Sequence, residues 1–338
     1  MRSAGIHHIT AIAGDPQTNL DFYTETLGLR LVKRTVNFDD PGSYHFYFGD
    51  NVGNPGTIIT FFPWPGARQG THGSGQVTVV GFAVPLNSMT FWKERLRANH
   101  VAAEEINDRF GSNGLRFRDP DGLMLELIES KPPVIPSENA SPTRTEASRG
   151  ESFKVSSSGS LDYARDNGVG EHRISGFAAP TLEVGHLERT EKLLTEILGF
   201  EFVSEENNRR RLRGSGLNAA AVDLVSSSAG FGLVAVGSVH HIAFRVANDE
   251  EQLRVREQLV ERGLHVTPVI DRQYFQSIYF REPNGILFEI ATDGPGFLID
   301  ESAEELGDSL KLPPMYESAR DEIERVLPPI QLRHATAS

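Results

Sequence analysis

The sequence contains no cysteine, which excludes disulfide bonds and leaves histidine, aspartate and glutamate as the side chains that could bind a metal ion. Basic residues are also scarce, since 33 Lys and Arg face 46 Asp and Glu and the formal net charge is −13. An acidic chain of this kind argues against nucleic acid as a partner. No apolar run approaches the length of a membrane span, and residues 1–8 lack the apolar core of a signal peptide. We therefore expect a cytoplasmic protein that binds neither nucleic acid nor a membrane.

One segment of the chain occurs twice. Residues Asp119–Ile128 return as Glu282–Ala291, and each copy predicts a tight turn followed by an apolar strand that carries one carboxylate. That carboxylate is Glu126 in the first copy and Glu289 in the second. An ionised carboxylate in a half-buried strand is costly unless a positive group meets it, and a metal ion is a common solution.

Further matches divide the chain into four related modules. Residues 22–32 match residues 193–203, each a predicted helix stopped by glycine and followed by a strand, and residues 75–84 match residues 237–246. The order strand, helix, three strands recurs at about 1–65, 75–130, 170–227 and 237–293, with the first strand of the third module expected over His172–Ala178. With 338 residues, 38% of them hydrophobic, the chain can bury several cores.

The predicted fold class is therefore α+β, with four βαβββ modules whose sheets curl in pairs into two half-barrel cavities. We expect the first pair of modules at 1–131, a linker rich in Pro, Ser, Thr and Glu at 132–169, the second pair at 170–295, and an acidic C-terminal extension at 296–338 with a helix near Glu317–Leu327.

Two histidine pairs stand at equivalent places in the first and fourth modules. These are His7-His8 and His240-His241, and adjacent strand residues face opposite sides, so we expect one histidine of each pair to face a cavity. The second module has Val79 at the place of His241, and we align Arg173 of the third module with His8.

We interpret His8, His241 and Glu289 as a metal site that modules one and four share, which leaves modules two and three to form a metal-free cavity. The alternative is hydrogen-bonded core histidines and an arginine-paired Glu289. Thr60 occupies the place in module one that matches Glu126 and Glu289, so a fourth protein ligand is missing. Two imidazoles and one carboxylate make the facial triad of non-haem Fe(II) oxygenases, whereas zinc favours tetrahedral surroundings. We expect Glu126 to be a surface or salt-bridged carboxylate.

The chain resembles the vicinal oxygen chelate superfamily, which includes extradiol dioxygenases, glyoxalase I and bleomycin-resistance proteins. Within it, four motifs look like those of the hydroquinone ring-cleaving dioxygenases, namely Ile6–Thr10, Leu31–Val36, Tyr44–Phe48 and Pro55–Thr57. The resemblance runs over most of residues 5–300. It implies that His8, His241 and Glu289 bind Fe(II), with Mn(II) as the other metal considered.

The same resemblance implies a set of catalytic residues around the metal, namely His7, Thr10, His240, Arg272 and Tyr279. Arg272 could hold the negative charge of a phenolate, and Tyr279 or His240 could move protons. Arg272 as a salt-bridge partner and Tyr279 as an ordinary core residue are the alternatives. His45 and His72 are further candidates for the border of the cavity.

The leading hypothesis is an Fe(II)-dependent dioxygenase that opens the ring of hydroquinone-type aromatics, in aromatic catabolism or detoxification, with a small aromatic substrate and O2 as partners. A catechol extradiol dioxygenase, a glyoxalase-like isomerase or lyase, and a non-catalytic aromatic-binding protein are the alternatives. Assembly into a homo-oligomer stays open.

Overall fold

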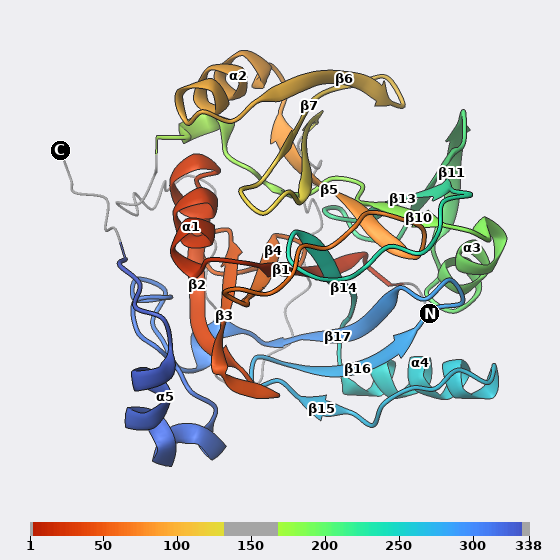
Figure 1. The fold of residues 1–338 in the computed structure, drawn as a ribbon. Coiled ribbons are helices and arrows are strands. Elements are labelled where there is room, and N and C mark those ends of the chain that lie inside the picture. Colours follow the sequence, from red (N-terminus) through yellow and green to blue (C-terminus); the bar gives the residue numbers. More distant parts are fainter. Residues whose placement is uncertain (1–2, 132–167, 333–338) are drawn as a thin grey trace, which may run out of the picture.

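The computed structural model describes residues 3–131 and 168–332, which form two curved sheets with a few helices around them (Figure 1). The predicted linker at 132–169 lies outside the described residues except for its last two positions. None of the helices in the described ranges is long and apolar enough to cross a membrane.

The eight-stranded sheet combines the first and fourth modules, in the order β15-β16-β17-β14-β1-β4-β3-β2. In chain order its strands are β1 (Ile6–Ala13), β2 (Arg30–Asn37), β3 (Asp40–Gly49), β4 (Ile58–Pro63), β14 (Ser238–Val246), β15 (Ile270–Asp271), β16 (Phe275–Arg281) and β17 (Leu287–Pro295). Strands β1 and β14 pair antiparallel at its centre, so the first and fourth modules meet there (Figure 1). The predicted pairing of module one with module four is confirmed.

The nine-stranded sheet combines the second and third modules in the same way, with β5 and β10 antiparallel at its centre. Its strands are β5 (Gln76–Pro85), β6 (Ala103–Arg109), β7 (Ser112–Arg118), β8 (Met124–Ser130), β9 (Gly176–Phe177), β10 (Thr181–Val184), β11 (Glu201–Glu206), β12 (Arg209–Arg213) and β13 (Ala221–Ser226). The short β9 pairs with β5 beside the main path.

One helix follows the first strand of each module, as the repeat predicted. These helices are α1 (Pro16–Asp21), which continues as a π-helix over Phe22–Thr26, α2 (Met89–Ala98), α3 (Leu187–Glu196) and α4 (Asp249–Glu261). At the start of α1 the Asp15 side chain accepts a hydrogen bond from the Thr18 backbone N–H, and Pro16 occupies the first position. The Tyr23 ring packs on Phe48 of β3 and Phe61 of β4. Because side chains alternate along a strand, the residues next to Phe48 and Phe61 point to the opposite face of the sheet.

The C-terminal extension returns to the first module. A 3-10 helix over Pro314–Ala319 leads into α5 (Arg320–Val326), which confirms the helix expected near Glu317–Leu327, and shorter 3-10 helices lie at Gly170–His172 and Phe297–Ile299. The Tyr44 hydroxyl donates to the backbone carbonyl of Pro328. The buried Lys33 ammonium binds Asp300 and Glu301, so this extension is part of the folded core.

The first strand of module three begins later than we predicted. The structure places Arg173 on the surface after a 3-10 helix, and the strand β10 starts only at Thr181. Thr181 pairs with Asp223 in the way that Thr10 pairs with Thr60, so the equivalent of His8, two residues earlier, is Ala179. The alignment of Arg173 with His8 was wrong because strand register follows from pairing with neighbouring strands, whereas a match of three residues is local.

Candidate metal centre

Three buried side chains converge at the centre of the eight-stranded sheet. Oε2 of Glu289 lies 2.9 Å from Nε2 of His241 and 3.2 Å from Nε2 of His8, and the two Nε2 atoms are 3.3 Å apart. One ligand atom from each residue lies within 4.8 Å of the others, and all three residues are buried. The predicted convergence of residues separated by 233 positions is therefore confirmed.

The order of the strands explains this convergence. Strands β1, β14 and β17 are neighbours in the sheet, and the register pairs Ala243 with Glu289. Because side chains alternate along a strand, His241 and Ala243 point to the same face as Glu289. His8 comes to this face from β1, across the antiparallel pair with β14.

The state of Glu289 fits a bound cation. Its Oε1 accepts a hydrogen bond from the Ser277 hydroxyl, whereas no hydrogen bond of acceptable geometry reaches its fully buried Oε2. Burial by itself would raise the pKa of Glu289, but His8 and His241 hold that pKa well below its usual range. In the described part of the chain no arginine pairs with Glu289, which contradicts the arginine-paired alternative.

The His241 imidazole is also in the state that a metal requires. Burial lowers the pKa of His241, with the neighbouring Glu289 acting in the opposite direction. A neutral imidazole and an ionised carboxylate are the forms that bind metals, so the two nitrogens and one oxygen make a donor set for a divalent cation.

Two bulges bring a second histidine to each of these imidazoles. The register of β1 against β14 shifts between Ile6 and His8, which makes His7 an extra residue, and it shifts again next to His241, which makes His240 extra. A bulge turns side chains away from regular alternation. Nδ1 of His7 consequently lies 2.9 Å from Nδ1 of His8, and Nδ1 of His240 lies 2.8 Å from Nδ1 of His241. We expected one histidine of each pair to face the cavity, and His8 and His241 converge there, while the bulges bring the other histidine of each pair into contact with its neighbour.

Both added histidines are neutral in this setting. Burial and the neighbouring His8 lower the pKa of His7, and burial together with His241 lowers the pKa of His240 to about 3. When Nδ1–H of His8 or His241 donates to its neutral neighbour, Nε2 keeps its lone pair and points at Glu289. The contacts that the bulges create are therefore compatible with the tautomer that can bind a metal.

Arg272 and Tyr279 lie beside the three ligands. Tyr279 pairs with Glu289 across β16 and β17, and its ring centroid lies 5.8 Å from that of His241. Nε of Arg272 donates to the Tyr279 hydroxyl at 3.1 Å, and Nη2 forms an ion pair with Asp39 at 3.2 Å. Burial raises the pKa of Tyr279, so the phenol stays protonated. Arg272 is thus a salt-bridge partner and a neighbour of the centre at once.

Thr10 lies next to the ligands, since it pairs with His241 across β1 and β14. Its hydroxyl accepts a hydrogen bond from Thr60, which in turn contacts Nε2 of His45 at 2.9 Å. Tyr47 contacts the other nitrogen of His45, also at 2.9 Å, and burial lowers the pKa of His45. Thr60 therefore occupies the position where a fourth ligand would stand, and its hydroxyl is part of a chain of hydrogen bonds. His72 lies elsewhere, exposed and in contact with Arg118, so its assignment to the border was wrong.

The sequence analysis missed three residues at the centre. Ser277 binds Glu289, Asp39 binds Arg272, and the Phe275 ring lies 5.0 Å from His7 and 5.1 Å from His8. The alternation of Phe275, Ser277 and Tyr279 along one strand was a usable signal, because all three then share a face. Asp39 left no such signal, since it lies in the turn between β2 and β3, 233 positions from Arg272 in the chain.

The nine-stranded sheet carries carboxylates at the equivalent positions but no imidazoles. Glu126 pairs with Gly81 as Glu289 pairs with Ala243, and Asp223 takes the same place in module three. Val79 and Ala179 occupy the two histidine positions. Glu126 is fully buried rather than on the surface, and it is salt-bridged, to Arg109 and Arg116. This half cannot bind a metal in the same way.

Comparison with known proteins gives a consistent result. The model of the Glyoxalase/Bleomycin resistance protein/Dioxygenase superfamily matches residues 5–127 and 176–290. The chain is 46% identical over 332 residues to the Bacillus subtilis (strain 168) protein named "Putative ring-cleaving dioxygenase MhqO", covering 98% of each chain. It is 31% identical over 345 residues to the "Chlorohydroquinone/hydroquinone 1,2-dioxygenase" of Sphingobium indicum, covering 96% of each.

Solved structures resemble the whole chain as well. A crystal structure titled "putative dioxygenase", from Bacillus subtilis, superposes with a TM-score of 0.86 at 45% identity and covers 98% of this chain and 99% of its own. Glyoxalase I from Zea mays superposes with a TM-score of 0.60 at 15% identity, over 86% of this chain and 92% of its own. The second similarity shows the fold alone.

Proposed function

We propose that this chain, which belongs to the Glyoxalase/Bleomycin resistance protein/Dioxygenase superfamily, is a ring-cleaving dioxygenase with a divalent metal ion held by His8, His241 and Glu289. The proposed metal is Fe(II), with Mn(II) as the alternative. The proposed substrates are a hydroquinone-type aromatic and O2. The enzyme class follows from full-length relatives that are named ring-cleaving dioxygenases, and the hydroquinone preference is supported by the name of the Sphingobium protein.

The observation that carries the proposal is the convergence of Nε2 of His8 and Nε2 of His241 on Oε2 of Glu289. No donor in the described residues forms a well-oriented hydrogen bond to this oxygen. Three protein ligands leave open positions on a six-coordinate metal, as in the facial triad of oxygenases. When bound, Fe(II) supplies the redox chemistry that lets O2 react with an aromatic ring.

The other residues near the metal centre bind and orient the substrate and stabilise the charge that develops on it. The Arg272 guanidinium holds negative charge that develops on the substrate oxygen, since it is half-buried and fixed by Tyr279 and Asp39. The Tyr279 hydroxyl stays protonated and can donate a proton. Phe275, next to His7 and His8, supplies an apolar surface for an aromatic ring.

Thr60 favours an oxygenase over a glyoxalase-type isomerase. A fourth protein ligand would have to come from this position, and its hydroxyl is already engaged by Thr10 and His45. A catechol extradiol dioxygenase shares the same three ligands, so only the substrate distinguishes the two ring-cleaving reactions.

Oxygen uptake by protein loaded anaerobically with Fe(II) tests the proposal. We expect a hydroquinone to consume one O2 per ring and yield a ring-opened product, with catechol much slower. If catechol is faster than every hydroquinone, the substrate assignment is wrong and ring cleavage stands. If no dihydroxybenzene consumes O2 with either Fe(II) or Mn(II), the proposed function is wrong.

A further inference from the structure

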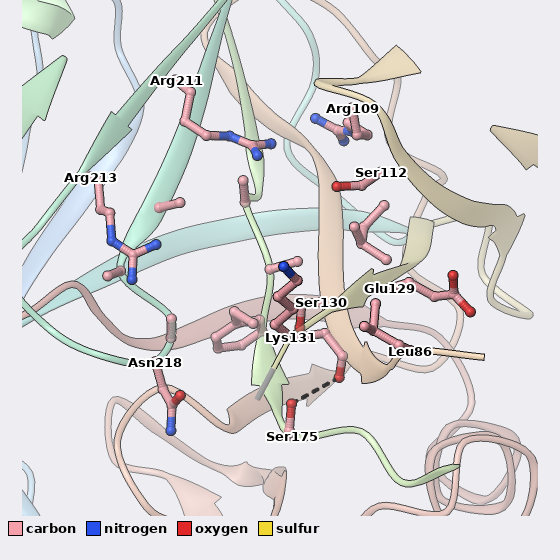
Figure 2. Close-up of a pocket in the computed structure, with 18 of the residues that line it drawn as sticks. Leu86, Arg109, Ser112, Glu129, Ser130, Lys131, Ser175, Arg211, Arg213 and Asn218 are labelled. Atoms are coloured by element: carbon pink, nitrogen blue, oxygen red, sulfur yellow. Dashed lines mark hydrogen bonds between the residues drawn. The ribbon is translucent and has the colours of Figure 1, made fainter. Parts of the chain in front are cut away.

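We propose that the nine-stranded sheet holds a second ligand site, separate from the metal centre, that binds a small organic carboxylate. A cavity of about 530 Å³ opens on this sheet, within the size range of roughly 300–1,000 Å³ that is typical of small-molecule sites. Figure 2 shows Arg211 and Arg213 of β12 on one side of the cavity and Arg109 and Ser112 on the other.

Two side chains of the cavity lining, Arg109 and Arg211, belong to a buried network of ion pairs. The carboxylates of this network, Glu126 and Asp223, stand where the other sheet has Glu289 and Thr60. Arg109 bridges both carboxylates, Arg116 also binds Glu126, and Arg209 and Arg211 also bind Asp223. The lining itself contains four cationic side chains, Arg109, Lys131, Arg211 and Arg213, and one carboxylate, Glu129. This excess of positive charge in the lining attracts an anion.

Some of the N–H groups at the cavity remain open to a ligand. Arg211 binds Asp223 through Nε and Nη2, and within the described residues its Nη1 makes no hydrogen bond. Among the described residues, the Arg213 side chain donates only to the backbone carbonyls of Gly216 and Leu217, at 3.4 and 3.3 Å. No carboxylate of residues 3–131 or 168–332 forms an ion pair with Arg213, in a chain whose net charge is −13. Clustered guanidinium groups in an acidic protein indicate recognition of an anion.

The alternation of β12 aims these groups at the cavity. Arg209, Arg211 and Arg213 are alternate residues and share the face that carries the ion-pair cluster. Arg210 points to the other face and pairs with Glu191 of α3. Of the arginines in β12, Arg211 and Arg213 line the cavity, whereas Arg210 faces α3.

The lining combines uncharged polar residues with apolar side chains, which points to an organic anion. Phe177, Ala179, Ala220 and Ile128 border the cavity, and Ala179 replaces the imidazole that would bind a metal. The one acidic lining residue, Glu129, is occupied by the Ser88 backbone N–H and the Asn113 side chain. A carboxylate on a short apolar or aromatic stem matches both parts of this lining.

Calorimetric titration of the full chain with benzoate tests the proposal, with benzyl alcohol as the neutral counterpart. We expect benzoate to bind about tenfold or more tightly than benzyl alcohol, because a charge-assisted pair with guanidinium is lost in the alcohol. Arg213→Gln should weaken benzoate binding by a similar factor. Arg210→Gln is the matched control, since it removes the same charge from the opposite face of the same strand, and it should bind benzoate as the parent does.

Three outcomes would overturn the proposal. The first is equal binding of benzoate and benzyl alcohol by the parent protein. The second is unchanged benzoate binding in both Arg213→Gln and Arg211→Gln, with folding of the latter checked by circular dichroism. The third is displacement of benzoate by equimolar inorganic phosphate, which would make this a general anion site. His241→Ala should bind benzoate as the parent does, because the metal centre is on the other sheet; loss of binding there would assign benzoate to the metal centre.

Discussion

Nδ1 of His7 lies 2.9 Å from Nδ1 of His8, and a bulge in β1 makes this contact between adjacent residues of one strand. His240 repeats the relationship with His241 on the partner strand. The two outer histidines are thus built into the centre symmetrically. When an outer histidine accepts a hydrogen bond from Nδ1–H of the inner imidazole, Nε2 of that imidazole keeps the lone pair that faces Glu289.

The first prediction concerns these outer histidines. His7→Phe and His240→Phe should each weaken the binding of Fe(II) by about 10–100-fold without abolishing it, because the inner imidazole loses the partner that fixes its tautomer. Competition with a chromophoric chelator under anaerobic conditions measures the affinity. The exposed His72→Gln is the control, and equal affinity of all three variants would show that the outer histidines do not set the tautomer.

The second prediction separates the two equivalent carboxylates. Glu289→Gln should remove stoichiometric metal and oxygen uptake together, because one of only three ligands is lost. Glu126→Gln should keep the metal, since Glu126 is bound by arginines on the other sheet. Metal analysis after anaerobic loading and gel filtration decides the matter. Full occupancy in the Glu289 variant would mean that the metal lies elsewhere.

The third prediction distinguishes substrate chemistry from metal binding. Arg272→Gln should retain the metal and lower kcat/KM by roughly 10²–10³-fold, the loss expected when one charge-stabilising donor is removed. Tyr279→Phe should act in the same direction. The exposed Arg254→Gln provides a control for charge, and metal loss in the Arg272 variant would make Arg272 a structural residue of the centre.

The fourth prediction concerns stability of the nine-stranded sheet. Arg109 has a side-chain exposure of 1% and bridges Glu126 and Asp223. Arg109→Met should lower the free energy of unfolding by about 3–5 kcal/mol, because it leaves buried carboxylates with fewer partners. Urea denaturation measures the change, with Arg210→Gln expected to cost about 1 kcal/mol or less. Similar stability of both variants would show that the network is dispensable.

The fifth prediction concerns pH. Burial raises the pKa of Asp119 to about 7, although the Leu123 N–H and the Tyr23 hydroxyl donate to it. Between pH 4 and 7 the folded state then binds a proton that the unfolded state has lost, so stability falls as pH rises, by at most about 1.4 kcal/mol per pH unit. Asp119→Asn should remove this slope in urea titrations at several pH values. A parent that gains stability relative to the variant over this range would show that hydrogen bonding outweighs burial.

Local patterns in the sequence predicted much of this architecture. The repeated turn and strand drew attention to Glu289, and the histidine pairs drew attention to His8 and His241. The location of these three residues predicted that modules one and four share a cavity. Their convergence was predictable because strand alternation, turn chemistry and internal repeats are properties of short segments. The resemblance of motifs to known dioxygenases added the catalytic candidates Arg272 and Tyr279, whose roles stay predictions.

Only the tertiary structure decided the features that depend on strand register and long-range pairing. The bulges at His7 and His240 arise where β1 meets β14, more than 200 positions apart in the chain, and no local pattern reveals them. The shifted start of β10 was likewise decided by its neighbours β5 and β13. The arginines that neutralise Asp223 come from two modules, Arg109 from the second and Arg209 and Arg211 from the third, because a buried charge pairs with whichever opposite charge the fold brings within reach. The sequence by itself determined which residue types were present at each strand position, and the pairing of distant strands decided which of them meet.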